Sequence, residues 1–294
     1  MHKFFVLLLL LLLPLSIFAD IKIAVTYPYI GAIVKEISKD KVSTYVLAKG
    51  NWDPHFVVPR PSLIAKVRRV DGIIINGGEL EIGWLPPLIK RASNSKIAKG
   101  SIGYLDLSRY IDFLDKPTKL DRADGDIHPD GNPHYHLDPK NILILAKAIK
   151  NYLIALDLDN KKEYETNYTS FVNLWNGKIK EWDKKMEDKK GIKIVQYHNN
   201  LAYFNNAYSL KTIGTIEPLP GIPPSSRHTM ELINKIKAQK PSAILHDVYH
   251  STKTAKFIAS KTGIPVIIMP HDIESLDEIE DLVSLFDYLT SAIK

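Results

Sequence analysis

The sequence predicts an α/β protein of two lobes, each a mainly parallel sheet flanked by helices, joined by a long spacer helix. Short β-branched segments alternate with amphipathic helical segments, which is the pattern of βαβ units and parallel sheets. This pattern occurs once before and once after a helical stretch at 161–189, which would be about 43 Å long at 1.5 Å per residue. The 294 residues are enough for about two domains of ~150 residues each.

In the first half we expect strands at 21–26, 42–47, 73–76 and 103–107, and helices at 31–38, 61–70 and 84–91. The first strand, IKIAVT, is β-branched and bounded by Asp20 and a Tyr-Pro-Tyr turn. The helix at 61–70 has Ser62 near its start and Asp71-Gly72 at its end. Residues 116–133 are rich in Pro, Gly and Asp and are expected to form a loop.

The second half begins with two helical patterns, at 141–156 and 161–189, and Gly191 ends the second of them. Strands are then expected at 192–197, 243–246 and 266–269, and helices at 229–238, 252–262 and 279–293. We therefore place an N-terminal lobe at 20–160, a linking helix at 161–190 and a C-terminal lobe at 191–294.

Residues 1–19 have the layout of a secretory signal peptide. Lys3 precedes an unbroken apolar run, Pro14 interrupts it, and Ala19 offers a small residue for cleavage. As a membrane anchor this segment is marginal, because about 20 apolar residues are needed to span a bilayer. We expect a secreted protein that is cleaved near Ala19.

Composition excludes several classes of protein and site. The chain has no cysteine, which rules out disulfides, thiolate metal sites, cysteine nucleophiles and the lipid anchor of a bacterial lipoprotein. Its net charge of +6 comes from scattered basic residues without a run of five or six, so we expect no nucleic-acid partner.

Histidines gather where the expected strands end. Five of them lie at strand ends or in the acidic loop: His128, His134, His198, His246 and His271. Ligands of open α/β sheets bind outside the carboxyl ends of strands. His198, His246 and His271 follow strands of one predicted sheet, so their side chains would surround one crevice. Imidazole suits zinc, and nearby carboxylates would complete the site. The sequence therefore predicts a metal site.

The segment 134–139, His-Tyr-His-Leu-Asp-Pro, leaves an alternative open. An H-x-H-x-D string resembles the metal-binding run of metallo-β-lactamase-type hydrolases, although those continue with His where this chain has Pro139. There is no H-E-x-x-H or G-x-S-x-G motif to support a common zinc protease or serine hydrolase. A secreted zinc-dependent hydrolase using the same His cluster remains the alternative function.

Three landmarks together resemble the zinc/manganese-type (cluster A-I) substrate-binding proteins of ABC transporters. Residues 50–55 read Gly-Asn-Trp-Asp-Pro-His, followed by Pro-Ser at 61–62 and Asn-Gly-Gly-Glu-Leu-Glu-Ile-Gly-Trp at 76–84. Residues 132–139 read Asn-Pro-His-Tyr-His-Leu-Asp-Pro, and 198–204 read His-Asn-Asn-Leu-Ala-Tyr-Phe. The matches occur in the family's order from about residue 20 to 275.

The resemblance implies one metal ion held between the lobes. The landmark histidines map onto His55, His134 and His198, and the family's fourth ligand, usually an acid near the last strand, falls at Asp272 with His271 as a competitor. His136 replaces the family's Trp and could be a ligand or a neighbour of one. His128, in the loop before the second motif, could also touch the metal.

The implied function is a periplasmic receptor that captures a metal ion and delivers it to an ABC permease in the inner membrane. Retention of His198, which manganese members tend to replace with an acid, favours Zn²⁺ over Mn²⁺, because nitrogen ligands suit zinc and oxygen ligands suit manganese. We expect a monomer without enzymatic activity. A periplasmic zinc buffer or an adhesin would share the same site.

Overall fold

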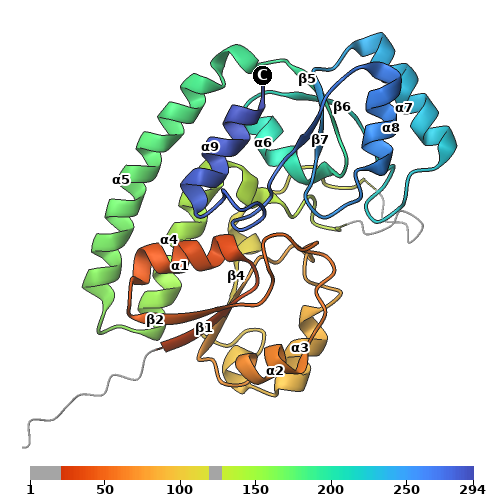
Figure 1. Cartoon of the computed structure of the whole chain (residues 1–294). Helices are drawn as coiled ribbons and strands as arrows, with labels where there is room; N and C mark the ends of the chain where they lie inside the picture. Colours follow the sequence, from red (N-terminus) through yellow and green to blue (C-terminus); the bar gives the residue numbers. More distant parts are fainter. Residues whose placement is uncertain (1–20, 119–127) are drawn as a thin grey trace, which may run out of the picture.

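The computed structural model describes residues 21–118 and 128–294, so the predicted signal peptide lies outside the described residues. It contains two four-stranded parallel sheets (Figure 1). The first is built from β1 (Ile21–Val25), β2 (Val42–Val46), β3 (Gly72–Ile75) and β4 (Tyr104–Asp106). The second is built from β5 (Lys193–Gln196), β6 (Lys211–Thr215), β7 (Ala243–His246) and β8 (Val266–Ile268).

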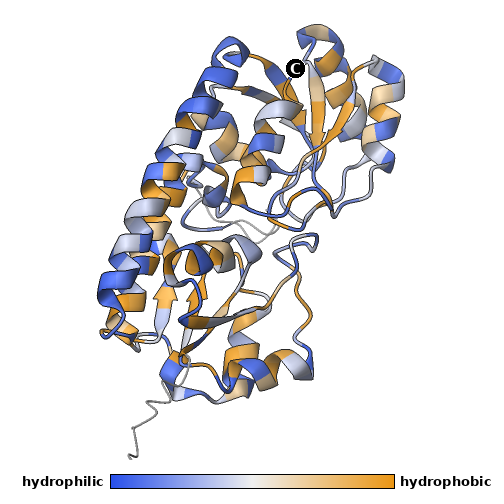
Figure 2. Ribbon diagram, turned by 60° about the vertical axis from the view of Figure 1, so that its left-hand side comes forward, coloured by the Kyte–Doolittle hydropathy of each residue, from blue (hydrophilic) through white to orange (hydrophobic). Residues whose placement is uncertain are grey.

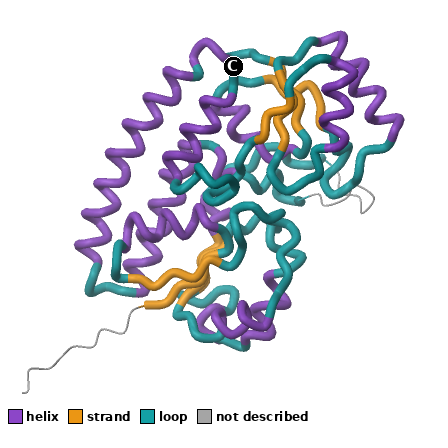
Figure 3. Tube along the Cα trace, in the orientation of Figure 1, coloured by secondary structure: helices purple, strands orange, loops and turns teal. Residues whose placement is uncertain are grey.

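The two sheets have the same strand order, β2-β1-β3-β4 and β6-β5-β7-β8, and every strand pair is parallel. The predicted fold class is thereby confirmed. Loops occupy the space between the two sheets (Figure 3), and the strand-end residues described below meet there.

Four helices flank the first sheet, and each has proline in its first turn: α1 (Pro28–Ser38), α2 (Pro61–Val67), α3 (Leu85–Ala92) and α4 (Pro139–Leu156). Proline is favourable there because the first helical N–H has no intrahelical partner. Helix α1 consequently begins at Pro28, three residues before the predicted start. Around the second sheet lie α6 (Ala202–Ala207), α7 (Ser226–Gln239), α8 (Lys253–Thr262) and α9 (Leu282–Ala292).

The sequence analysis missed two of these elements, α6 and β6. Helix α6 has only six residues, too few for a clear helical period. Strand β6 is an edge strand in which only Ile213 is buried, so its sequence KTIGT lacks the apolar run expected of a buried strand.

Helix α5 (Lys161–Lys185) runs along both lobes (Figure 1) and packs on α1, α4 and α9. It ends four residues earlier than predicted, and a 3₁₀ turn at Glu187–Lys189 follows. Its Trp175 ring nitrogen donates to the Pro139 carbonyl at 2.7 Å, and that of Trp182 donates to Asp287 at 2.7 Å. The helix is thus attached to α4 on one side and to α9 on the other.

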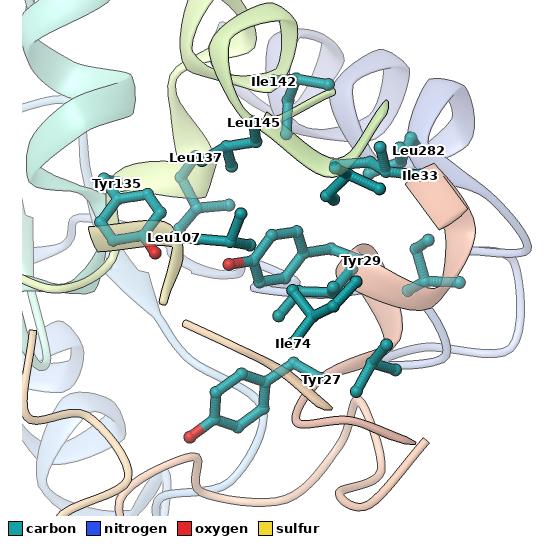
Figure 4. Packing of buried hydrophobic residues seen from close by; sticks show 14 of the residues in the cluster. Tyr27, Tyr29, Ile33, Ile74, Leu107, Tyr135, Leu137, Ile142, Leu145 and Leu282 are labelled. Carbon is teal, nitrogen blue, oxygen red and sulfur yellow. The ribbon is translucent and has the colours of Figure 1, made fainter. Parts of the chain in front are cut away.

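The main hydrophobic core is continuous through both lobes. It joins residues of β1 and β3 to residues of β5, β7 and α9, while a smaller core covers the other face of the second sheet. Figure 4 shows Leu282 of α9 among side chains of the N-terminal lobe such as Ile33, and Figure 2 shows apolar strands in both sheets. Within the described ranges, no helix combines the length and apolar character needed to cross a membrane.

Candidate metal centre

His55, His134 and His198 converge between the lobes. One ring nitrogen from each lies within 4.8 Å of the others, and the ring centroids are 5.3 to 5.5 Å apart. His55 follows β2, His134 precedes α4, and His198 follows β5, so both lobes contribute. His134 and His198 are buried, and His55 is half-buried.

Carboxylates orient two of the three rings. The Nδ1 atom of His55 lies 3.0 Å from Asp53 Oδ1, and that of His198 lies 2.6 Å from Glu217 Oε2. A histidine that ligates a metal usually donates its other ring N–H to a carboxylate or carbonyl, which fixes the tautomer and raises ligand basicity. Nε2 of His55 is buried and has no hydrogen-bond partner among the described residues.

His134 is the most enclosed of the three histidines. Neither of its ring nitrogens has a partner in the described part of the chain. Burial, followed by the neighbouring His55 and His198, lowers its pKa well below 6.5, so the ring is neutral and its lone pair is available. Burial raises the pKa of the Asp53 carboxyl, but its interactions with His55, chiefly hydrogen bonds, outweigh burial and hold that pKa below its ordinary value.

The first landmark fixes the backbone beside His55. The Pro54 carbonyl accepts hydrogen bonds from the Tyr27 hydroxyl at 2.8 Å and from the Trp84 ring nitrogen at 3.2 Å. The Glu81 carboxyl accepts from the backbone N–H of Asn76 at 2.7 Å and closes the turn between them. Burial raises the pKa of Glu81 to about 7.

The same turn explains the two glycines of that landmark. Gly77 and Gly78 have φ of +79° and +60°, the left-handed region that favours glycine. A Cβ on Gly77 would lie 1.9 Å from Asp106 Oδ1. The turn allows the Asn76 amide to donate to the Pro133 carbonyl at 3.2 Å, directly before His134.

Asn132 connects the second landmark to the third. Its side-chain oxygen accepts from the His134 backbone N–H at 3.0 Å, and its amide donates to the Asn199 carbonyl at 2.7 Å. The Tyr203 hydroxyl donates to the Asn132 carbonyl at 2.9 Å. These contacts hold the chain beside His134 against the chain beside His198, so the landmarks act as a scaffold for the imidazoles.

Asp272 does not lie with the three histidines. Its carboxylate accepts from the backbone N–H of Ile273 at 2.7 Å and from that of Tyr29, in the first turn of α1. Burial raises its pKa well above the ordinary value. A carboxylate at a helix N-terminus interacts favourably with the unpaired N–H groups there, and here it connects the C-terminal lobe to α1 of the N-terminal lobe.

His136 and His271 lie at the same contact. The Nε2 atom of His136 donates to the His271 carbonyl at 2.8 Å, and its ring stacks on Tyr29 with centroids 4.3 Å apart. The His271 ring bonds to the backbone of Trp52. We call this contact the interlobe seam, which comprises Tyr29, Gly50, His136, His271, Asp272 and Ser275.

Three further histidines, His128, His246 and His250, have different surroundings. The His128 ring lies 5.4 Å from that of His55. His246 is fully buried, with Nδ1 2.7 Å from the Asp247 carbonyl. His250, which the sequence analysis did not single out, has Nδ1 2.9 Å from Asp247 Oδ2 and stacks on Tyr197.

The sequence analysis also missed two carboxylates that bond to rings of the candidate site. Asp53 stands two residues before His55 in the landmark, and this spacing was a usable signal. Glu217 lies just beyond β6, which was itself not predicted, so no sequence signal pointed to it. Together the two carboxylates would balance the charge of a divalent ion held by neutral imidazoles.

The chain matches known proteins over nearly its full length. A family model described as "Zinc-uptake complex component A periplasmic" matches residues 23–294. The iron ABC transporter substrate-binding lipoprotein MtsA of Streptococcus pyogenes serotype M1 is 28% identical over 258 residues, covering 84% of this chain and 78% of that protein. The manganese ABC transporter substrate-binding lipoprotein PsaA of Streptococcus mitis is 25% identical, with the same coverage.

Solved structures agree with the fold. A zinc-bound ZnuA deletion mutant has a TM-score of 0.77 at 25% identity, covering 94% of this chain and 98% of that one. A manganese-bound periplasmic metal-binding protein from Candidatus Liberibacter asiaticus has a TM-score of 0.75 at 21% identity, covering 93% of this chain and 98% of that one.

Proposed function

This chain belongs to the family of the periplasmic zinc-uptake complex component A, the substrate-binding proteins of metal ABC transporters, and from that premise we propose that it captures zinc for an ABC permease. The proposed ligands are His55, His134 and His198. The ion would be held between the lobes and released to the permease, without chemical conversion.

The observation that carries the proposal is the convergence of three imidazoles from both lobes within 4.8 Å. Two nitrogens on a tetrahedral zinc lie about 3.3 Å apart, given Zn–N distances of 2.0–2.1 Å. The rings therefore need only a modest contraction to meet one ion. Carboxylate partners on His55 and His198 leave Nε2 as the ligand atom in each.

The choice of zinc rests on the donor atoms. Relatives are named for iron and for manganese, so membership of the family leaves the metal open. Three imidazoles favour zinc, whereas manganese prefers carboxylate, carbonyl and water oxygens. The ion is the transported substrate rather than a resident cofactor.

We further propose a periplasmic, monomeric protein that is not lipid-anchored. The relatives are named as lipoproteins, and a bacterial lipoprotein is anchored through cysteine, which this chain lacks. The signal-peptide pattern at 1–19 supports export.

The element bound by protein purified without added metal tests the function directly. We expect about one zinc per chain by elemental mass spectrometry. Manganese or iron in place of zinc would contradict the proposed substrate. Esterase, lactamase or phosphatase turnover by the zinc-loaded protein, lost in His198→Ala, would instead favour the hydrolase.

A further inference from the structure

We propose that His128 is the fourth ligand of the bound ion, in the role that the family resemblance gives to Asp272, so that four imidazoles hold the metal. This inference rests on the proposed function and specifies the donor set of the same site.

The His128 ring lies as close to the His55 ring as the rings of His134 and His198 do. Its ring centroid is 5.4 Å from that of His55, compared with 5.3 Å and 5.5 Å for His134 and His198. It lines a small cavity together with His134 and His198. The ring therefore lies beside His55, on the wall of a cavity that His134 and His198 also line.

Its hydrogen bonding also matches that of a ligand. Nε2 of His128 is buried and has no partner among the described residues, while the ring bonds to the backbone of Gly78. One ring nitrogen is thus held and the other is free, as in His55. Leaving a buried polar atom unpaired is costly, and a metal ion would satisfy it.

Protonation does not oppose this role. Burial, with smaller contributions from His55 and His198, lowers the pKa of His128 to about 3. The imidazole is therefore neutral near pH 7 and has no proton to lose before it binds. Because His128 lies outside the set within 4.8 Å, we expect its ring to move toward the ion on binding.

Other candidate ligands are already engaged. Asp272 is bound to backbone N–H groups at the interlobe seam. Glu217 accepts from the His198 ring and from the Gly221 N–H at 2.9 Å. His250 is held by Asp247, and its ring lies 6.4 Å from that of His198.

A fourth imidazole has a consequence for selectivity. An acid in the fourth position supplies the oxygen that Mn²⁺ prefers, whereas His128 makes every donor a neutral nitrogen. Four imidazoles should therefore increase the ratio of Zn²⁺ affinity to Mn²⁺ affinity. Replacement of His128 by an acid should decrease that ratio.

The test compares His128→Ala with Asp272→Asn and with a control, His250→Ala, which removes a nearby imidazole. Zinc affinity is measured by chelator competition, and Co²⁺ reports coordination through its visible absorption. We expect His128→Ala to weaken zinc binding by at least the ~10–100-fold that loss of an outer-shell partner costs, and to alter the cobalt spectrum. Added imidazole should restore the parent spectrum, which a misfolded variant could not show.

The other variants should separate the alternatives. Asp272→Asn and His250→Ala should keep the parent's zinc affinity and cobalt spectrum, and His128→Asp should gain Mn²⁺ affinity relative to Zn²⁺. Unchanged zinc affinity and spectrum in His128→Ala would overturn the inference, as would a loss in Asp272→Asn that matches His128→Ala. If His55→Ala still abolished binding in that case, the proposed function would survive while the inference failed.

Discussion

The lobes meet at two histidine-rich places that differ in how the rings are bonded. In the cluster that we propose to bind the metal, which comprises His55, His128, His134 and His198, carboxylates hold Nδ1 of His55 and His198. At the interlobe seam, His136 and His271 donate to backbone carbonyls of the opposite lobe. The difference teaches that strand-end position alone does not identify a candidate metal ligand, and that the convergence of His55, His134 and His198 within 4.8 Å does.

The two places also differ in what they need in order to form. The seam is made of contacts within the chain, including the Ser275 hydroxyl bonded to the Gly50 carbonyl at 2.9 Å, and it adjoins the shared core. It should hold the lobes together with or without metal. In the cluster, Nε2 of His55 and both ring nitrogens of His134 are buried without a partner among the described residues, and the proposed ion would satisfy them.

The largest effect is expected from a substitution that removes a ligand of the cluster and leaves the seam intact. His198→Ala should lose tight zinc binding, because it removes a ligand and leaves Glu217 buried without its partner. Zinc should stabilise the parent by about 4 kcal/mol at a thousandfold excess over Kd, since it binds only the folded state. Thermal melting with and without zinc measures this gain. An undiminished gain in His198→Ala would show that the ion binds elsewhere.

The next largest effect is expected from a substitution that disrupts the seam and leaves the proposed ligands of the cluster unchanged. A Cβ on Gly50 would lie 1.6 Å from the Ile273 carbonyl oxygen, so Gly50→Ala must push the lobes apart locally. Overpacking of this kind costs about 1–3 kcal/mol. Denaturant unfolding of the metal-free protein should show the loss. If Gly50→Ala had the same free energy of unfolding as the parent, the seam would not be closely packed at Gly50.

A third effect concerns pH at the seam. Burial lowers the pKa of His271 to about 4, below the ~6.5 of an unfolded chain. As the pH falls below about 6.5, His271 is protonated in the unfolded state but stays neutral in the folded state. The free energy of unfolding therefore decreases from its value at neutral pH. At pH 5 the loss from this residue is about 2 kcal/mol.

His271→Gln, which keeps a donor for the Trp52 carbonyl, should remove that loss. Urea unfolding of the metal-free variant and parent at pH 7 and pH 5 measures the difference. An equal drop in both proteins would show that His271 is not the group responsible.

The smallest effect is expected at His136. Its ring stacks on Tyr29 with an interplanar angle of 9°, and Trp, the residue the family carries there, offers a larger flat surface for the same stack. His136→Trp should keep the zinc-dependent gain in melting temperature. Should it lose that gain as fully as His134→Ala does, His136 would be a ligand and the seam would be misassigned.

The sequence predicted the repeated βα pattern, and the family resemblance grouped His55, His134 and His198, whose ring nitrogens lie within 4.8 Å of one another in the folded chain. It could not separate these histidines from His136 and His271. Both groups follow strands or landmarks, and only the folded chain shows which rings meet backbone carbonyls. Asp272 was assigned to the metal by family position, whereas its contacts with the first turn of α1 depend on how closely the lobes approach.

The position of the zinc ion tests the central claim most directly. Anomalous diffraction at the zinc edge from crystals of the metal-loaded protein should show one strong peak within ligand distance of His55, His134 and His198, with His128 as the fourth ligand. A peak beside Asp272 or His271, with the cluster empty, would contradict the distinction drawn between the cluster and the seam.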